Sequence, residues 1–171
     1  MHSLGNCPKY LQNRVITGPT DDVPAGKART GKELTDGQRS WIEQADTFFI
    51  AGHAPEQGAD SSHRGGMPGF VTVAGPRTLR WPDCTGNQFS MTLGNLHVDP
   101  SCDLLFLDRE HGHTLQFTGT GRIDWDPRSA AAYPGALRVV EFAIDTVVEI
   151  DNASPLRREL LNHSRFNPPV A

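Results

Sequence analysis

Short apolar and alternating runs, separated by turn residues, dominate the pattern of hydrophobic and polar positions from residue 46 onward. Residues 137–150 alternate over a length that suits one long strand, and residues 47–51 form a β-branched and aromatic run that ends at Gly52. A segment containing Gly112 joins two further runs and provides the tight reversal of a hairpin. The pattern therefore predicts about six strands, at residues 47–51, 70–73, 78–81, 102–108, 114–118 and 137–150.

Helical signals are few and short. Thr35 and Gln38 form a capping box ahead of Trp41 and Ala45, which lie four residues apart, so we expect a helix from residue 35. Three further short helices are expected, at residues 92–98, after Asp126-Pro127 and after Ser154-Pro155. The segments predicted to be turn-rich connections are residues 53–69 and 82–87.

Strands spaced by turns, without regular alternation of strand and helix, favour an antiparallel barrel over a parallel sheet. Residues 15–34 are rich in glycine, proline and charge and are expected to form an extended arm or loop. The 171 residues are enough for one domain with a hydrophobic core. We therefore expect an N-terminal arm over residues 1–34 and one mainly β domain over residues 35–171.

Composition narrows the possible partners and compartments. A net charge of -4 does not favour nucleic acid, whose binding domains are normally basic. The three cysteines, Cys7, Cys84 and Cys102, are far apart, and an odd, sparse set suits a reducing compartment. No apolar run approaches the roughly 20 residues of a membrane helix, and residues 1–10 lack the apolar stretch of a signal peptide. We expect a cytoplasmic protein with no nucleic-acid or membrane partner.

The segment from residue 60 to residue 70 carries the densest chemistry. It places two hydroxyl groups, a histidine, Arg64 and two glycines within a few residues. Glycines let the backbone approach an anion, hydroxyls donate to its oxygens, and arginine can grip a phosphate through two parallel donors. A long surface turn whose arginine pairs with a carboxylate explains the same residues equally well.

A second candidate segment begins at Trp81, which could pack on a planar ring, while Asp83 and Asn87 could hydrogen-bond polar edges. If Thr92 opens a helix, its N-terminal amides would favour a phosphate. Taken alone, a type I turn at Pro82-Asp83 and an ordinary threonine N-cap explain these residues better.

The sequence gives little support for a metal site, a hydrolase nucleophile or a common nucleotide-binding motif. His111 and His113 lie across the expected hairpin tip, but no third ligand is suggested, so we expect no metal there. No Gly-x-Ser-x-Gly nucleophile motif, Gly-x-Gly-x-x-Gly fingerprint or P-loop occurs.

Taken together, the motifs resemble the pyridoxamine 5'-phosphate oxidase-like family of predicted flavin-nucleotide-binding proteins. The strongest match is ADTFFIA at residues 45–51, followed by DSSHRGGMPGFV at residues 60–71. The match continues, in order, through residues 82–83, 86–87, 92–96, 104–106 and 115–119, with further landmarks at 6–10 and 155–157.

The resemblance implies a six-stranded antiparallel Greek-key split β-barrel with short flanking helices. It also implies a homodimer that holds FMN in the groove between its subunits. By position, the residues that would meet the flavin and its phosphate are Ser62, His63, Arg64 and Gly65. Those that would line the isoalloxazine and ribityl side are Trp81, Pro82, Asp83 and Asn87, and those that would close the phosphate end are Thr92, Leu93 and Asn95.

The chain departs from the family pattern at three places. Cys84 stands where an aromatic residue is common, Asp103 replaces a usual glycine, and Thr120-Gly121 replaces a usual Arg-Ala pair. Similar proteins often carry another barrel-like region before the landmark at residues 6–10, and some continue into a reductase module. The chain is therefore expected to be a short relative or a truncated one.

A flavin site does not define a reaction, because fold and function separate. We expect an FMN-dependent oxidoreductase with an unknown small-molecule redox substrate and no assigned catalytic residue. Pyridoxamine-phosphate oxidation itself is less favoured, because no separate basic pocket for a second phosphate is evident. The alternatives are a non-catalytic flavin carrier or sensor, and a split barrel that holds haem or a deazaflavin.

Overall fold

The computed structural model describes residues 8–19, 24–56, 58–85 and 91–170. The described residues form three α-helices, one 3-10 helix and ten strands. The helical elements are η1 (Pro8–Tyr10), α1 (Asp36–Gln44), α2 (Met91–Val98) and α3 (Pro127–Ala130). The strands are β1 (Asn13–Pro19), β2 (Arg29–Gly31), β3 (Thr47–Ala54), β4 (Gly58–Gly65), β5 (Thr72–Gly75), β6 (Thr78–Cys84), β7 (Ser101–Leu107), β8 (Thr114–Asp124), β9 (Ala136–Ile150) and β10 (Leu156–Asn162).

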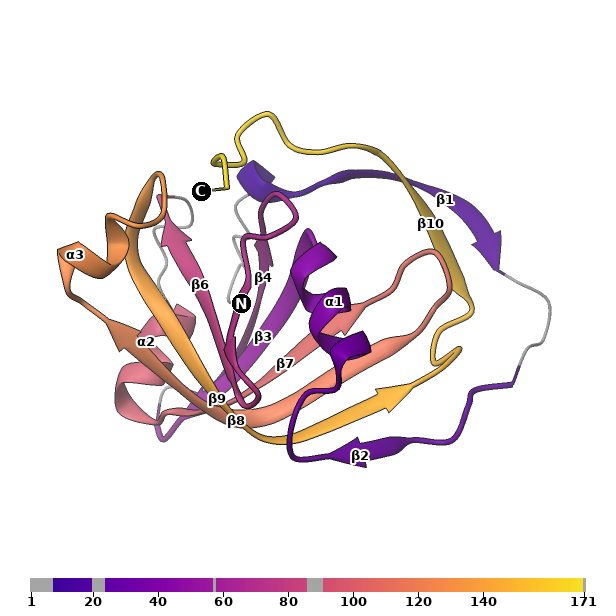
Figure 1. The fold of residues 1–171 in the computed structure, drawn as a ribbon, viewed down its shortest axis with the longest axis horizontal. Helices are drawn as coiled ribbons and strands as arrows, with labels where there is room; N and C mark the ends of the chain where they lie inside the picture. The colour runs from indigo at the N-terminus through magenta and orange to yellow at the C-terminus, as the bar shows by residue number, and fades with distance from the viewer. Residues whose placement is uncertain (1–7, 20–23, 57, 86–90, 171) are drawn as a thin grey trace.

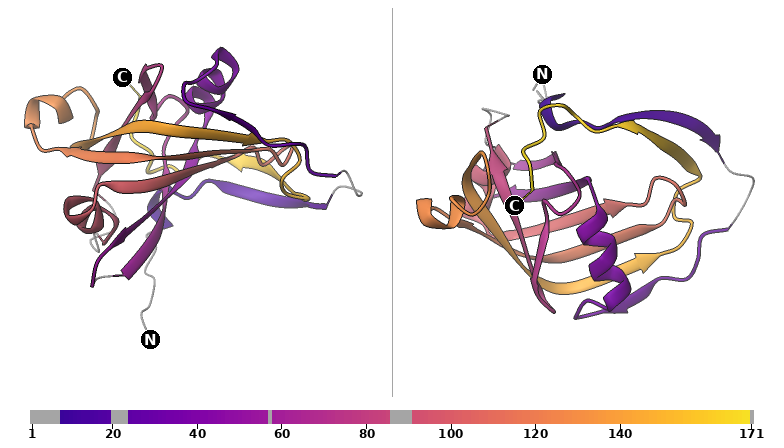
Figure 2. Two further views of the ribbon diagram at one scale, coloured as in Figure 1. Left: turned by 90° about the horizontal axis from the view of Figure 1, so that it is seen from below. Right: turned by 45° about the horizontal axis from the view of Figure 1, so that its top comes forward.

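One eight-stranded sheet carries the architecture (Figure 1). Its hydrogen-bonded order is β4-β3-β7-β8-β9-β6-β5, with β2 added to β9, and every pair is antiparallel. The sheet curls, so that β4 at one end of this order and β6 near the other face each other across a split (Figures 1 and 2). The remaining strands, β1 and β10, pair in a separate two-stranded ribbon.

Several local predictions are confirmed. The capping box at Thr35 is complete, since its hydroxyl accepts from the Gln38 amide and the Gln38 side chain accepts from the Thr35 amide. The predicted hairpin is β7-β8, the long alternating strand is β9, and the helices at residues 92–98 and after Asp126 are α2 and α3. Across the described chain, no helix is long and apolar enough to cross a membrane.

Three predictions are wrong. The segment at residues 53–69 is not only a turn-rich connection, because β4 lies in it and pairs with β3 along its whole length. Residues 82–84 continue β6 instead of turning. The helix expected after Ser154-Pro155 is strand β10, whose backbone pairs with β1. The partner of β4 is the preceding strand β3, whereas β6 and β10 pair with strands far along the chain, β9 and β1, which no local pattern predicts.

The expected arm also contributes strands. β1 and β2 fall within residues 13–31, and they pair with β10 and β9 respectively. These long-range pairings give an otherwise unpatterned segment its extended conformation. The division of the chain at residue 34 stays a prediction.

An apolar core fills the inside of the curled sheet. Phe48 packs on Phe106 with ring centroids 5.1 Å apart and on Trp81 edge to face at 5.0 Å. Phe106 in turn contacts Phe117 at 5.8 Å. Aromatic side chains carry large buried areas, so this cluster is a main source of stability. Trp81 is 1% exposed and belongs to the core.

Strand β8 contains a β-bulge, which bends the strand. The pairing register of β8 with β9 shifts between Thr118 and Gly119. A Cβ atom at Gly119 would lie 2.1 Å from the Ala143 carbonyl oxygen and 2.7 Å from the Phe142 ring. Only glycine allows the two strands to approach this closely, and a bulge bends its strand at such a point.

The chain segments on either side of the ribbon return to the barrel and are tied together at Gln12. The Gln12 side-chain amide donates to the carbonyl oxygens of Asp46 and Gly66, at 3.3 Å each. Its oxygen accepts from the Ser164 amide at 2.8 Å and from the Asn167 side chain at 3.0 Å. One buried glutamine thus joins the N-terminal segment, β3 and the segment after β10.

Candidate functional site

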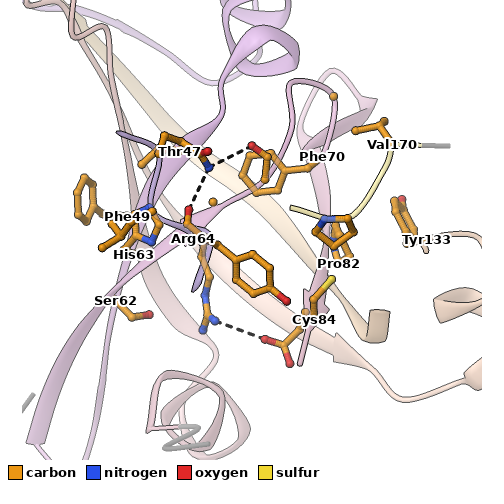
Figure 3. Close-up of a pocket in the computed structure, with 18 of the residues that line it drawn as sticks. Thr47, Phe49, Ser62, His63, Arg64, Phe70, Pro82, Cys84, Tyr133 and Val170 are labelled. Atoms are coloured by element: carbon orange, nitrogen blue, oxygen red, sulfur yellow. Dashed lines mark hydrogen bonds and ion pairs between the residues drawn. The ribbon is translucent and has the colours of Figure 1, made fainter. Parts of the chain in front are cut away.

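A cavity of about 390 Å³ opens at the split between β4 and β6 (Figure 3). Its lining residues come from β3, β4 and β6, from the segments before β1 and after β4, from the turn after β7, and from β10 and the segment after it. Small-molecule sites usually measure roughly 300–1,000 Å³, so the size suits a small organic ligand.

The alternation of β4 divides the cavity into two ends. Arg64 pairs in register with Phe48, whose side chain lies in the core, whereas His63 pairs with Phe49 on the opposite face of β3. Figure 3 shows Phe49 and His63 side by side, with Arg64 extending away from them. We call the Arg64 side the inner end and the His63 side the outer end.

Asp83 anchors the inner end. Its Oδ1 atom lies 3.4 Å from Nη1 of Arg64, and its Oδ2 atom accepts from Nε of Arg138 at 2.9 Å. One carboxylate on β6 therefore holds an arginine from β4 and another from β9, which joins the strands that face each other across the split.

A hydroxyl chain holds α2 against β4. The Ser62 and Thr92 hydroxyl oxygens are 2.8 Å apart, and Thr92 donates to the Asp60 carboxylate. Because Thr92 donates to Asp60, Ser62 must donate to Thr92. Thr92, Leu93 and Asn95 are all at least 95% buried, and Asn95 donates to the Gly58 carbonyl oxygen at 3.4 Å. Helix α2 therefore supports β4 through these three buried residues.

His63 lies at the outer end beside Phe49, with ring centroids 6.0 Å apart in an edge-to-face arrangement. Burial, followed by the positive charges of Arg109 and Arg64, lowers the pKa of His63 to about 4. The ring is therefore neutral at pH 7.

Among the residues that the structure describes, three buried polar atoms in the cavity walls have no hydrogen-bond partner. They are Oγ1 of Thr47, Nε2 of His63 and Nε of Arg64. A buried polar group left unpaired costs about 1–3 kcal/mol, and several such groups around one hollow indicate a place for a polar ligand.

Three arginines at the outer end were missed by the sequence analysis. Arg14 comes from β1, Arg109 from the turn after β7, and Arg158 from β10, and all three line the cavity. The Arg109 guanidinium lies over the Phe49 ring, 5.8 Å from its centroid. No local motif marks these residues, because only the fold brings the three segments together.

Gly65 allows the N-terminal segment to form a cavity wall. A Cβ atom there would lie 2.2 Å from the Tyr10 carbonyl oxygen and 2.9 Å from the His63 ring. The glycine of the predicted anion-binding motif therefore has a clear packing role at the end of β4.

Cys84 lines the cavity at the end of β6. Burial, aided by the negative charge of Asp83, raises the pKa of Cys84 to about 11. The thiol is therefore protonated at pH 7, and thiolate chemistry is disfavoured.

The hairpin tip brings a third potential ligand to the two histidines. Candidate ligand atoms of Asp108, His111 and His113 lie within 4.8 Å of one another. The expectation that the two histidines have no third potential ligand nearby is therefore wrong. The Asp108 carboxylate accepts from the amides of Glu110 and His111 and contacts the His111 ring at 2.9 Å. These contacts hold the loop in shape. The expectation of no metal stays a prediction.

The predicted site residues separate into three groups. Those that line the cavity are Ser62, His63, Arg64, Gly65, Pro82 and Asp83. Those buried in the core or behind β4 are Trp81, Thr92, Leu93 and Asn95. Asn87 lies outside the described residues. Whether each touches a ligand stays a prediction.

Solved structures with the same architecture support the fold. A variant of HupZ from Group A Streptococcus matches with a TM-score of 0.53 at 13% identity, covering 67% of this chain and 98% of that one. A putative pyridoxamine 5'-phosphate oxidase from Lactobacillus delbrueckii matches with a TM-score of 0.52 at 16% identity, covering 68% and 94%. No protein-family model and no curated protein sequence matches the chain. The predicted mainly β, antiparallel split-barrel fold is confirmed.

Proposed function

We propose that this split barrel binds a flavin nucleotide, FMN, in the cavity and acts as a flavin-dependent oxidoreductase on an unknown small molecule. The observation that carries the proposal is the set of buried polar atoms on Thr47, His63 and Arg64, unpaired among the described residues, which belong to the lining of one cavity of suitable size. The sequence motifs and the fold shared with a putative pyridoxamine 5'-phosphate oxidase support the choice of ligand.

The residues present fit such a group. Arg64 supplies a cation for a phosphate, while Phe70 provides apolar surface for a flat ring system. Neutral His63 can exchange a hydrogen bond through Nε2 with a polar ring edge. A bound flavin supplies the electron or hydride transfer, and the chain binds it, orients it and excludes water.

The first test is the absorption spectrum of the purified protein, followed by FMN titration monitored by quenching of flavin fluorescence. We expect Arg64→Gln to weaken FMN binding by about 1.5–3 kcal/mol, the range for a hydrogen bond to a charged group. The matched control is Arg122→Gln, since Arg122 pairs with Glu141 and is not among the cavity-lining residues. Failure to bind FMN, with no change in melting temperature, would reject the proposal.

A second measurement distinguishes a flavin-dependent oxidoreductase from a non-catalytic flavin carrier or sensor. An oxidoreductase is expected to accept electrons from NADH or NADPH into the bound flavin and to pass them to an acceptor. A flavin that stays oxidised with both donors would favour the carrier or sensor alternative.

One observation favours haem as a second candidate. His63 lines the cavity, is neutral at pH 7 and has a buried Nε2 atom that is unpaired among the described residues, and neutral imidazole is a common iron ligand. A Soret band after reconstitution with haem, lost in His63→Ala, would support that alternative over FMN.

We also propose that the protein is a homodimer with FMN at the subunit interface. The β1-β10 ribbon exposes apolar side chains that a second copy could cover, namely Val15, Ile16, Leu156 and Leu161, each 43–63% exposed. Sedimentation is expected to show a dimer. A monomer that binds FMN tightly would contradict an interface site.

A further inference from the structure

The arginines of the outer end are held next to one another by the fold. The Arg158 amide on β10 donates to the Arg109 carbonyl oxygen at 2.8 Å, which attaches the ribbon to the turn after β7. Arg14 lies on β1, the partner strand of β10 in the ribbon. Phe49 adds an aromatic surface beneath the Arg109 guanidinium. The outer end therefore combines a flat apolar wall with several donors.

The positive charge at this end exceeds the negative charge that faces it. Asp46 forms an ion pair with Arg14, and the His163 ring also lies 3.4 Å from this carboxylate. In the described part of the chain, the guanidinium groups of Arg109 and Arg158 form no ion pair or side-chain hydrogen bond.

The acids next to Arg109 in the sequence do not offset its charge. Asp108 precedes Arg109 but directs its oxygens to loop amides and to His111. Glu110 follows it and is exposed to solvent. Burial, and then the like charges of Arg14 and Arg158, lower the pKa of Arg109.

Such an arrangement favours an anion. Like charges held together in a half-buried place repel one another, and an anionic group relieves that repulsion. Guanidinium forks match the geometry of phosphate and carboxylate, which they bind through two parallel donors.

We infer that the outer end is a subsite for the anionic group of a second ligand, bound by Arg109 and Arg158 with its apolar body against Phe49. The substrate class is thus a small aromatic or apolar molecule with a phosphate or carboxylate. The inference rests on the proposed function, because this ligand would share the cavity with the flavin.

The subsite is distinct from the inner end. Arg64 extends from the opposite face of β4 and is paired with Asp83, whereas Arg109 and Arg158 form no ion pair within the described ranges. Both ends belong to one cavity, and the expectation that the chain has no separate basic pocket for a second phosphate stays a prediction.

The test is calorimetric titration of the FMN-loaded protein at low salt with phenyl phosphate, benzoate and phenol. Phenyl phosphate or benzoate is expected to bind, which identifies the preferred anion, and neutral phenol is not. Arg109→Gln and Arg158→Gln should each weaken binding about tenfold or more. Arg122→Gln, the same charge change in a different surface hollow, should alter it less than twofold. Arg158→Lys keeps the charge and should recover part of the affinity.

The outcomes separate this inference from the flavin proposal. Equal affinity in the parent protein and both glutamine variants, or no binding of either anion, would overturn the subsite. Loss of FMN affinity in the same variants, with displacement of phenyl phosphate by FMN, would show that the cluster holds the flavin's own phosphate, which also overturns it. If FMN does not bind but the flavin-free protein takes phenyl phosphate in an Arg109-dependent manner, the subsite stands and the flavin proposal fails.

Discussion

The two ends of the cavity use arginine in opposite ways. At the inner end, Arg64 and Arg138 share one buried carboxylate, Asp83, which links the strands across the split. At the outer end, Arg109 and Arg158 are held close to each other and form no ion pair with the acids that the structure describes. The ion pair of Arg64 links two strands in addition to placing a cation in the cavity wall, whereas the guanidinium groups of Arg109 and Arg158 keep charge that a ligand can use.

The largest expected effect is at the inner end. Asp83→Asn removes the anion that two arginines share, and those side chains are only 21% and 19% exposed. Leaving two such cations unpaired should lower the free energy of unfolding by about 3 kcal/mol, measured by urea denaturation.

The matched variant at the outer end is Arg158→Gln, which breaks no ion pair among the described residues. Its free energy of unfolding should change by less than about 0.5 kcal/mol. A loss as large as that of Asp83→Asn would remove the distinction between the two ends.

The close approach of the N-terminal segment to the end of β4 is tested by Gly65→Ala. The new methyl group would lie 2.2 Å from the Tyr10 carbonyl oxygen, so the N-terminal segment must shift. We expect a loss of about 2 kcal/mol in the free energy of unfolding. Gly37→Ala in α1 is the control, since nothing lies within 4 Å of its Cβ position and it should gain up to about 1 kcal/mol. Equal effects would show that the close approach at Gly65 imposes no constraint.

The smallest effect is electrostatic and is measured at His63, which lies between the arginines of both ends. NMR titration of its ring should give a pKa of about 4, and Arg109→Gln should raise that pKa because one positive charge is removed. A pKa near 6.5 in the parent protein would contradict both the burial and the excess of charge.

The same shift affects stability. The pKa of His63 is lower in the folded chain than its ordinary value of 6.5, so between about pH 6.5 and pH 4 the unfolded chain binds more protons. Stability should therefore fall as the pH is lowered through this range. His63→Gln should make that fall shallower in denaturation curves recorded across the range.

The parts of the fold predicted from the sequence are those with local causes. The capping box at Thr35 acts over three residues, and the β7-β8 hairpin requires only its turn. β4 was missed because its polar sequence lacks an apolar face, since its residues serve the cavity and α2 instead of the core. β10 was missed because Ser154-Pro155 imitates a helix start, whereas its backbone partner lies on β1.

The site residues also divide into those with a local sequence signal and those that only the fold brings together. Arg64 and Ser62 could be proposed because they lie within one short motif, which the fold places in one wall. Trp81 was expected to stack on a ligand, yet it packs edge to face on Phe48 inside the core. Arg109 and Arg158 could not be found, because only the ribbon and the hairpin turn bring them together.

The buried glutamine at position 12 has a kinetic consequence. It accepts from Ser164, 152 positions further along the chain, and the ribbon pairs Asn13 with Asn162. Closing a loop of this length carries a large entropic cost, and contacts between distant positions form slowly. The barrel core can therefore condense first, while the outer wall of the cavity is completed in a late step. During synthesis on the ribosome, a nascent chain could hold a nearly finished barrel and still lack a closed binding site.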